Sequence, residues 1–117
     1  MRIFATLLAA SLLLAATPSG QVSLGIGALD SNAIVVRIDG KEQAVTLADA
    51  KAGSAPATAF LKCLVAGRVV RIKGPHSAAT ALLLDDTSVA DHVNEFLQSK
   101  TSMDPCELGK AAYRGHK

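Results

Sequence analysis

One segment of this chain, residues 59–72, constrains the fold most, because it has the pattern of an amphipathic helix that ends at a glycine and runs into a buried strand. Phe60 and Leu64 are four residues apart, and two more apolar residues, one position further on, repeat that spacing on the same helical face. Gly67 can adopt the left-handed conformation that ends a helix at little cost. The Val and Ile residues that follow favour a strand. The chain is therefore expected to combine helices with β-strands.

The first 20 residues are typical of an export signal. Arg2 supplies a positive charge, residues 4–16 are almost wholly apolar, and small residues with a proline follow. An apolar run of about 13 residues is short for a membrane span, which needs about 20. We therefore expect a cleaved signal peptide over residues 1–20, one domain over residues 21–117, a secreted or periplasmic location and no membrane span after cleavage. An uncleaved anchor is the alternative.

The expected export indicates a role for the two cysteines, Cys63 and Cys106. Two cysteines in a small exported domain most often pair, because the compartment permits oxidation and a small core is only marginally stable. Closing this loop would stabilise the fold by roughly 4 kcal/mol. We predict a disulfide that ties the first helix to the C-terminal helix; two buried, unpaired thiols are the alternative.

Turn signals and side-chain alternation predict five short strands and three helices. The strands are expected over residues 22–28, 33–38, 44–48, 69–72 and 80–84. Helices are expected after Ser54, Ser88 and Asp104, each of which can act as an N-cap. In the first strand small residues form one face, which would let another backbone approach closely. This order, with a helix after the third strand and helices at the C-terminus, predicts an α+β domain, mainly β, with a five-stranded barrel of the oligonucleotide/oligosaccharide-binding (OB) type.

Five sequence segments in this order resemble the staphylococcal-nuclease-like (thermonuclease) family. The resemblance covers about residues 22–100, and the helix-to-strand segment and the Val-Asn segment carry most of its specificity. The segments are LDSNA (29–33), VTLA (45–48), FLKCLVAGR (60–68), ALLL (81–84) and VNEFL (93–97).

The resemblance implies a fold, but at the catalytic positions this chain departs from the family. Those nucleases hold calcium with two aspartates, activate water with a glutamate and stabilise charge with two arginines. The two aspartate positions fall on Asn32 and Lys51, and the glutamate position falls on Ser54. The two arginine positions fall on Thr46 and Ala79. A lysine disfavours a divalent cation at its position, so we expect no catalytic residues, no metal ligands and no cofactor.

The sequence therefore predicts an exported, non-catalytic nuclease-like OB domain that acts as a binding or structural module. Its partner, a protein or a small molecule, is not identified by the sequence. A weak calcium-dependent nuclease is the first alternative. It would need carboxylates in another register, but placing Asp49 at the metal position puts Ala44 where the arginine belongs.

Anion binding and nucleic-acid binding are two further alternatives. Lys51 could hold an anion where the cation is missing, although a solvated loop lysine is the simpler interpretation. Nucleic acid is less favoured, because OB barrels usually stack bases on aromatic residues and this chain has no tryptophan. The net charge of +2 also exerts little electrostatic attraction. The cations that could form a basic stripe are Arg37, Lys62, Arg68, Arg71, Lys73, Lys110, Arg114 and Lys117.

Other titratable residues are assigned simpler roles. His76, His92 and His116 do not have the spacing of metal ligands and are expected at the surface. Asp85 and Asp86 are adjacent at the end of a strand, which favours a turn over a metal site.

Overall fold

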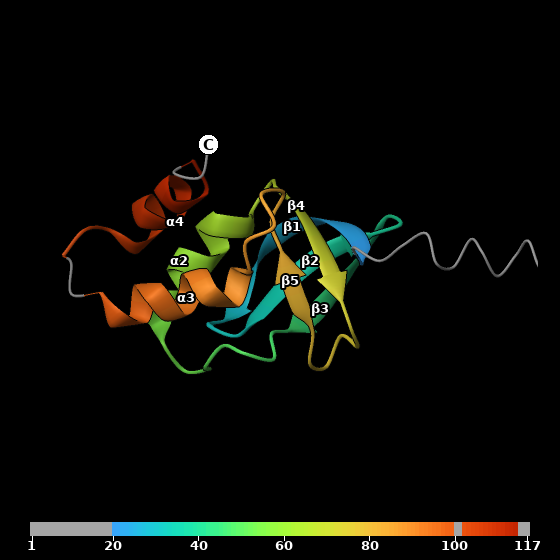
Figure 1. Cartoon of the computed structure of the whole chain (residues 1–117), viewed down its shortest axis with the longest axis horizontal. Helices are drawn as coiled ribbons and strands as arrows, with labels where there is room; N and C mark the ends of the chain where they lie inside the picture. Colours follow the sequence, from blue (N-terminus) through green and yellow to red (C-terminus); the bar gives the residue numbers. More distant parts are fainter. Residues whose placement is uncertain (1–19, 100–101, 115–117) are drawn as a thin grey trace, which may run out of the picture.

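The computed structural model describes residues 20–99 and 102–114, which form a five-stranded sheet and three helices (Figure 1). The expected signal peptide lies outside these residues except for Gly20, as does His116. The elements are β1 (Gln21–Asp30), β2 (Ala33–Ile38), β3 (Lys41–Thr46), α2 (Ala55–Val65), β4 (Val69–Lys73), β5 (Thr80–Leu82), α3 (Val89–Gln98) and α4 (Pro105–Arg114).

The sheet is antiparallel throughout, with the strand order β3-β2-β1-β4-β5. The predicted α+β class is confirmed. The described strands do not close into a continuous barrel, because the end of β3 and the residue before β5 meet only at an isolated parallel bridge between Leu47 and Ala79. Two backbone hydrogen bonds accompany the bridge, from Ala79 N to Thr46 O (2.8 Å) and from Ala48 N to Ala79 O (3.0 Å).

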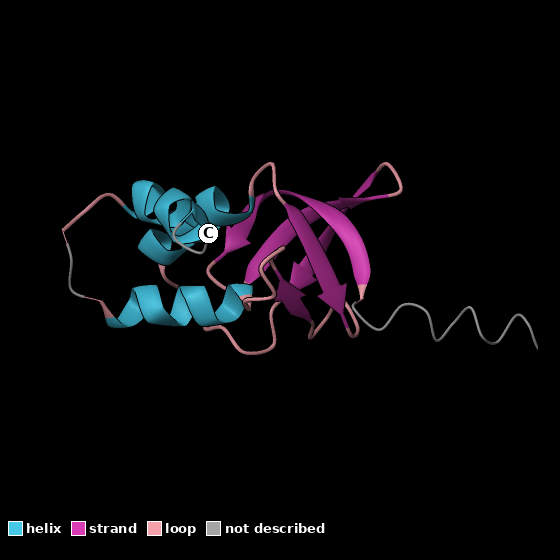
Figure 2. Ribbon diagram, turned by 45° about the horizontal axis from the view of Figure 1, so that its top comes forward, coloured by secondary structure: helices cyan, strands magenta, loops and turns pink. Residues whose placement is uncertain are grey.

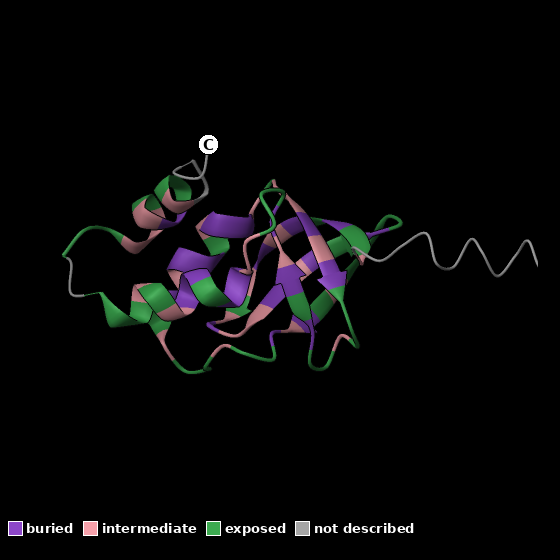
Figure 3. Ribbon diagram, in the orientation of Figure 1, coloured by how far each residue is buried: buried purple, intermediate pink, exposed green. Residues whose placement is uncertain are grey.

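The three helices gather at one end of the molecule and the sheet forms the other (Figure 2). The hydrophobic core lies where α2 and α3 cover the sheet, as the buried segments in Figure 3 show. The four apolar residues predicted to share a face of α2 are all buried, with exposures of 0–4%. They are Phe60, Leu61, Leu64 and Val65.

Local signals in the sequence fix where the helices begin. The Ser54 hydroxyl accepts a hydrogen bond from Ala57 N (3.2 Å), and the Ser88 hydroxyl accepts one from Asp91 N (3.3 Å). Asp104 Oδ2 accepts one from the third residue of α4 at 3.1 Å. All three predicted N-caps are therefore confirmed. None of the helices in the described ranges has the length and apolar character needed to cross a bilayer.

The small-residue face of β1 packs directly against the end of α2. Gly25 N donates to Arg68 O (2.8 Å), and Gly67 N donates to Gly25 O (2.9 Å). A Cβ atom on Gly25 would lie 2.1 Å from the carbonyl oxygen of Val65. The predicted close backbone approach is confirmed. On the opposite face of β1, Val22 is 63% exposed, whereas Ala28 further along the strand is partly buried against the core.

The prediction that His92 lies at the surface is wrong. Its exposure is only 6%, because α3 turns it toward the loop that follows β5. Phe96, one helical turn later, stacks on Phe60 with ring centroids 4.7 Å apart. The next residue, Leu97, points away from this contact and is 39% exposed.

Candidate functional site

The segments that carry Asn32, Thr46, Lys51, Ser54 and Ala79, the five positions singled out by the resemblance, come together at one end of the sheet. Asn32 O accepts a hydrogen bond from Leu47 N (2.7 Å), which joins the turn after β1 to the end of β3. Thr46 O accepts from Ala79 N, so the segment before β5 joins the same place. Asn32, Thr46 and Ala79 are far apart in the sequence, and these backbone hydrogen bonds bring their segments into contact.

Ser31 draws the remaining two positions into this cluster. It is fully buried, and its hydroxyl donates to Lys51 O at 2.5 Å. The same oxygen accepts from Ser54 N at 3.2 Å. Nothing in the sequence marks Ser31 for this role, because its partners lie 20 and 23 residues further along the chain.

Asp30 completes the link between the β1–β2 turn and the loop before α2. Its Oδ1 accepts hydrogen bonds from Gly53 N (2.8 Å) and from Ser31 N (2.7 Å). These backbone donors, Gly53 first and Ser31 second, lower the pKa of the Asp30 carboxyl because they stabilise its charged form. We call Asp30 and Ser31 the loop clamp.

Helix α3 holds the same loop from the other side. Asn94 Nδ2 donates to the backbone carbonyl of Asp49 at 2.8 Å. The loop of residues 47–54 is therefore fixed through Asn32, the loop clamp and Asn94. Asn94 belongs to the Val-Asn segment of the resemblance, and its contact ties that segment to this cluster.

The side chains in the cluster offer little for metal-dependent chemistry. The five positions carry an amide, two hydroxyls, an ammonium and a methyl group, with neither carboxylate nor guanidinium. Ala79 is buried, whereas Lys51 is exposed. Within residues 20–99 and 102–114, no group of three His, Cys, Asp or Glu residues is arranged to hold a metal ion.

A second polar cluster, absent from the sequence predictions, lies in the loop between β5 and α3. The Thr87 hydroxyl donates to Asp85 Oδ1 (2.5 Å), and Thr87 Oγ1 lies 2.9 Å from His92 Nε2. Thr87 N also donates to Asp85 Oδ1 at 3.1 Å. Asp86 has a positive φ of 67° and pairs with Arg71. The prediction that the two adjacent aspartates form a turn is confirmed.

The hollow beside this turn has an acidic lining. Asp86, Asp91 and Glu95 are among the residues around its volume of about 530 Å³. Carboxylates repel an anionic ligand, so this hollow is a poor site for a phosphate or a nucleic-acid backbone.

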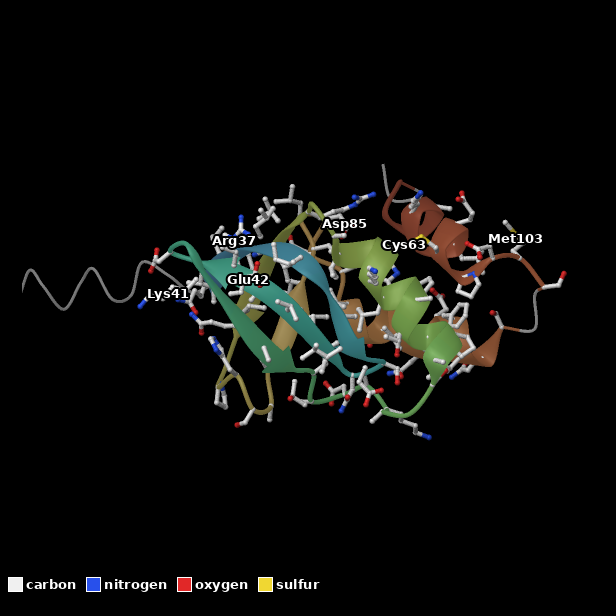
Figure 4. The ribbon with its side chains drawn as sticks, turned by 180° about the vertical axis from the view of Figure 1, so that it is seen from behind. Arg37, Lys41, Glu42, Cys63, Asp85 and Met103 are labelled. Atoms are coloured by element: carbon white, nitrogen blue, oxygen red, sulfur yellow. A yellow bond between two sulfur atoms is a disulfide. The ribbon has the colours of Figure 1, made fainter. Side chains whose placement is uncertain are left out.

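Several cations of the proposed basic stripe are engaged in ion pairs. Arg37 lies 3.2 Å from Glu42 across the β2–β3 hairpin, where Figure 4 shows both side chains. Arg71 pairs with Asp86 as described above, and Lys110 lies 3.8 Å from Glu107. These pairs reduce the positive charge that the stripe could offer to a phosphate backbone.

The predicted disulfide between Cys63 and Cys106 is present. It joins the last turn of α2 to the first turn of α4, with the two Cα atoms 5.1 Å apart. It therefore connects the helix after the third strand to the C-terminal helix, as expected from the sequence.

The sequence matches no protein-family model and no curated protein.

Proposed function

We propose that this chain is a non-catalytic, exported domain of the staphylococcal-nuclease-like kind that acts as a binding or structural module. The observation that carries this proposal is the use of Asp30. This carboxylate lies where the resemblance calls for a catalytic centre, yet it accepts hydrogen bonds from the backbone of its own loop. It contributes to holding the loop in place, and none of the five positions that the resemblance assigns to the nuclease site carries an acidic group.

An OB-type barrel is part of this proposal. The strand order β3-β2-β1-β4-β5 places β3 and β5 at the two edges of the sheet. The parallel bridge between Leu47 and Ala79 joins segments next to those edges, which is the contact needed to curl the sheet into a barrel. Helix α2 follows β3, where the resemblance expects a helix.

Catalysis of phosphodiester cleavage would need groups that this cluster does not supply. A bound cation and a guanidinium normally neutralise the charge that develops on the phosphate. Lys51 stands at one of the metal positions, and its positive charge opposes a second cation there. Ala79 offers only a methyl group at an arginine position, so the transition state would be left without a positioned donor.

A cleavage assay tests the absence of nuclease activity. The purified protein is incubated with single-stranded DNA or RNA, with calcium in one sample and a chelator in the other. We expect equal, background cleavage in both samples. Calcium-dependent cleavage that disappears in Asp30→Ala or Asp49→Ala would contradict the proposal. A contaminating nuclease would persist in both variants, which makes them the control.

A nucleotide titration separates the proposed module from an anion-binding module centred on Lys51. The loop clamp fixes the carbonyl of Lys51 and leaves its side chain exposed. We expect Lys51→Ala to bind the nucleotide no differently from the unmodified protein. Micromolar binding that Lys51→Ala abolishes would replace the proposed function with anion binding.

A further inference from the structure

Helix α4 is attached to the rest of the domain chiefly through α2. Its backbone packs so close that a Cβ atom on Gly109 would lie 2.4 Å from the carbonyl oxygen of Phe60. Its apolar side chains contribute little, because Leu108 and Ala112 are only partly buried against the core. The buried members of the core cluster all lie between Ile34 and Val93. Within the described residues, the buried apolar side chains of the core therefore come from segments before α4, and α4 covers that core from outside at Phe60.

As an isolated element, α4 would be a weak helix. It has ten residues, and isolated helices shorter than about 12–15 residues are marginal in water. Gly109 near its centre lowers its helical propensity further. The helical state of α4 must therefore depend on its attachment to α2.

The attachment includes one covalent bond, located at the seam between the two helices. Cys63 and Cys106 are both only partly buried, and Cys63 lies on the side of α2 that meets α4 (Figure 4). The disulfide therefore lies outside the fully buried core, near the surface of the domain. Beside the seam, a groove of about 410 Å³ runs between the helices, with Phe60, Phe96 and Leu108 among its lining residues.

We propose that the Cys63–Cys106 disulfide is a redox latch for α4. Attack by a dithiol reductant breaks the sulfur–sulfur bond through a mixed disulfide. The two protein sulfurs take up two electrons and two protons, and the reductant becomes a disulfide. Without the covalent bond, α4 leaves α2 and unwinds, and the apolar surface around Phe60 and Phe96 becomes exposed. The sheet, α2 and α3 stay folded, since the buried apolar side chains that hold them together lie between Ile34 and Val93. This latch is independent of the function proposed above.

Backbone amide NMR of the protein before and after reduction tests the latch. We expect the resonances of residues 105–114 to move to random-coil values in the reduced protein, while those of β1, β2 and β4 keep their positions. Reoxidation should restore the first spectrum. Unchanged α4 resonances would overturn the proposal, because docking would then not need the disulfide. Collapse of the whole spectrum would also overturn it, because the disulfide would then hold the entire core.

Two further readouts make the result specific to α4. Tyr113 is the only tyrosine and the chain has no tryptophan, so intrinsic fluorescence anisotropy reports on this helix alone. We expect the anisotropy to fall on reduction. The Cys63→Ser/Cys106→Ser double variant should match the reduced protein without any reductant and should not respond to it. A double variant that keeps α4 docked would contradict the latch.

Discussion

At the scale of single residues, the negative charge of Asp30 contributes to the stability of the folded protein. Its pKa is lowered in the folded protein from an ordinary value of 3.8, because Gly53 and Ser31 donate to its charged form. A carboxyl with a lowered folded pKa stabilises the protein above its unfolded pKa. That contribution is lost as the pH falls through the folded value, so part of the acid sensitivity of this protein should come from Asp30.

The Asp30→Asn variant tests this assignment. We expect it to melt at a lower temperature than the unmodified protein at pH 6. The difference should begin to shrink as the pH falls below 3.8, where the unfolded chain takes up a proton at Asp30. It should vanish once the pH is below the lowered pKa of the folded protein, because the native carboxylate is then protonated as well. Melting curves from pH 2 to pH 6 provide the measurement. Asp49→Asn is the matched control, since Asp49 bonds to Asn94 through its backbone carbonyl. A constant difference across this pH range would show that the charge of Asp30 is not what stabilises the loop.

At the scale of elements, the contact between β1 and α2 depends on the absence of a side chain at Gly25. We expect Gly25→Ala to destabilise the fold by about 2 kcal/mol or more, since added atoms in a packed contact force the backbone apart. Gly27→Ala is the matched control, because its nearest neighbour would be a flexible Lys62 carbon at 3.9 Å. It should change the free energy of unfolding by less than about 1 kcal/mol. Urea denaturation of both variants gives the comparison, and equal effects would contradict the packing argument.

The elements also show which parts of the fold local sequence could predict. Ser54, Ser88 and Asp104 cap helices through donors three residues away, and Gly67 takes a φ of 76° at the end of α2. Helix caps and helix ends of this kind can be predicted from residues that are close together in the sequence. The paired cysteines were predictable as well, because a small exported domain gives two cysteines few other roles.

The features that the sequence did not reveal depend on contacts between distant segments. The bond from Ser31 to Lys51 O and the bond from Gly53 to Asp30 each span about 20 residues, so no local pattern encodes them. His92 is buried because Thr87 and the turn after β5 contact α3 there. The sequence predicted a surface residue, because His92 does not have the spacing of a metal ligand. Only the resemblance, and no local pattern, singled out Asn32, Thr46, Lys51, Ser54 and Ala79 together, and their register remains part of the proposal.

At the scale of the whole molecule, the sheet, α2 and α3 form one packed unit, and α4 is held to it through α2 and one disulfide. In the function proposed above, backbone hydrogen bonds and the loop clamp close the end of the sheet that a nuclease would use. The proposed module would keep a stable surface for a partner without supplying catalytic groups. Its specificity would then depend on exposed side chains rather than on a metal centre.

The central claim is that Asp30 holds its loop in place and binds no metal ion. The most direct test is a calcium titration that monitors the backbone amide resonances of Ser31 and Gly53. Both amides donate to Asp30, so any cation that binds this carboxylate must disturb them. We predict no saturable shift up to about 10 mM calcium, a concentration above the dissociation constants of weak calcium sites. A saturable shift of both amides that Asp30→Asn abolishes would contradict the account, because Asp30 would then be a metal ligand.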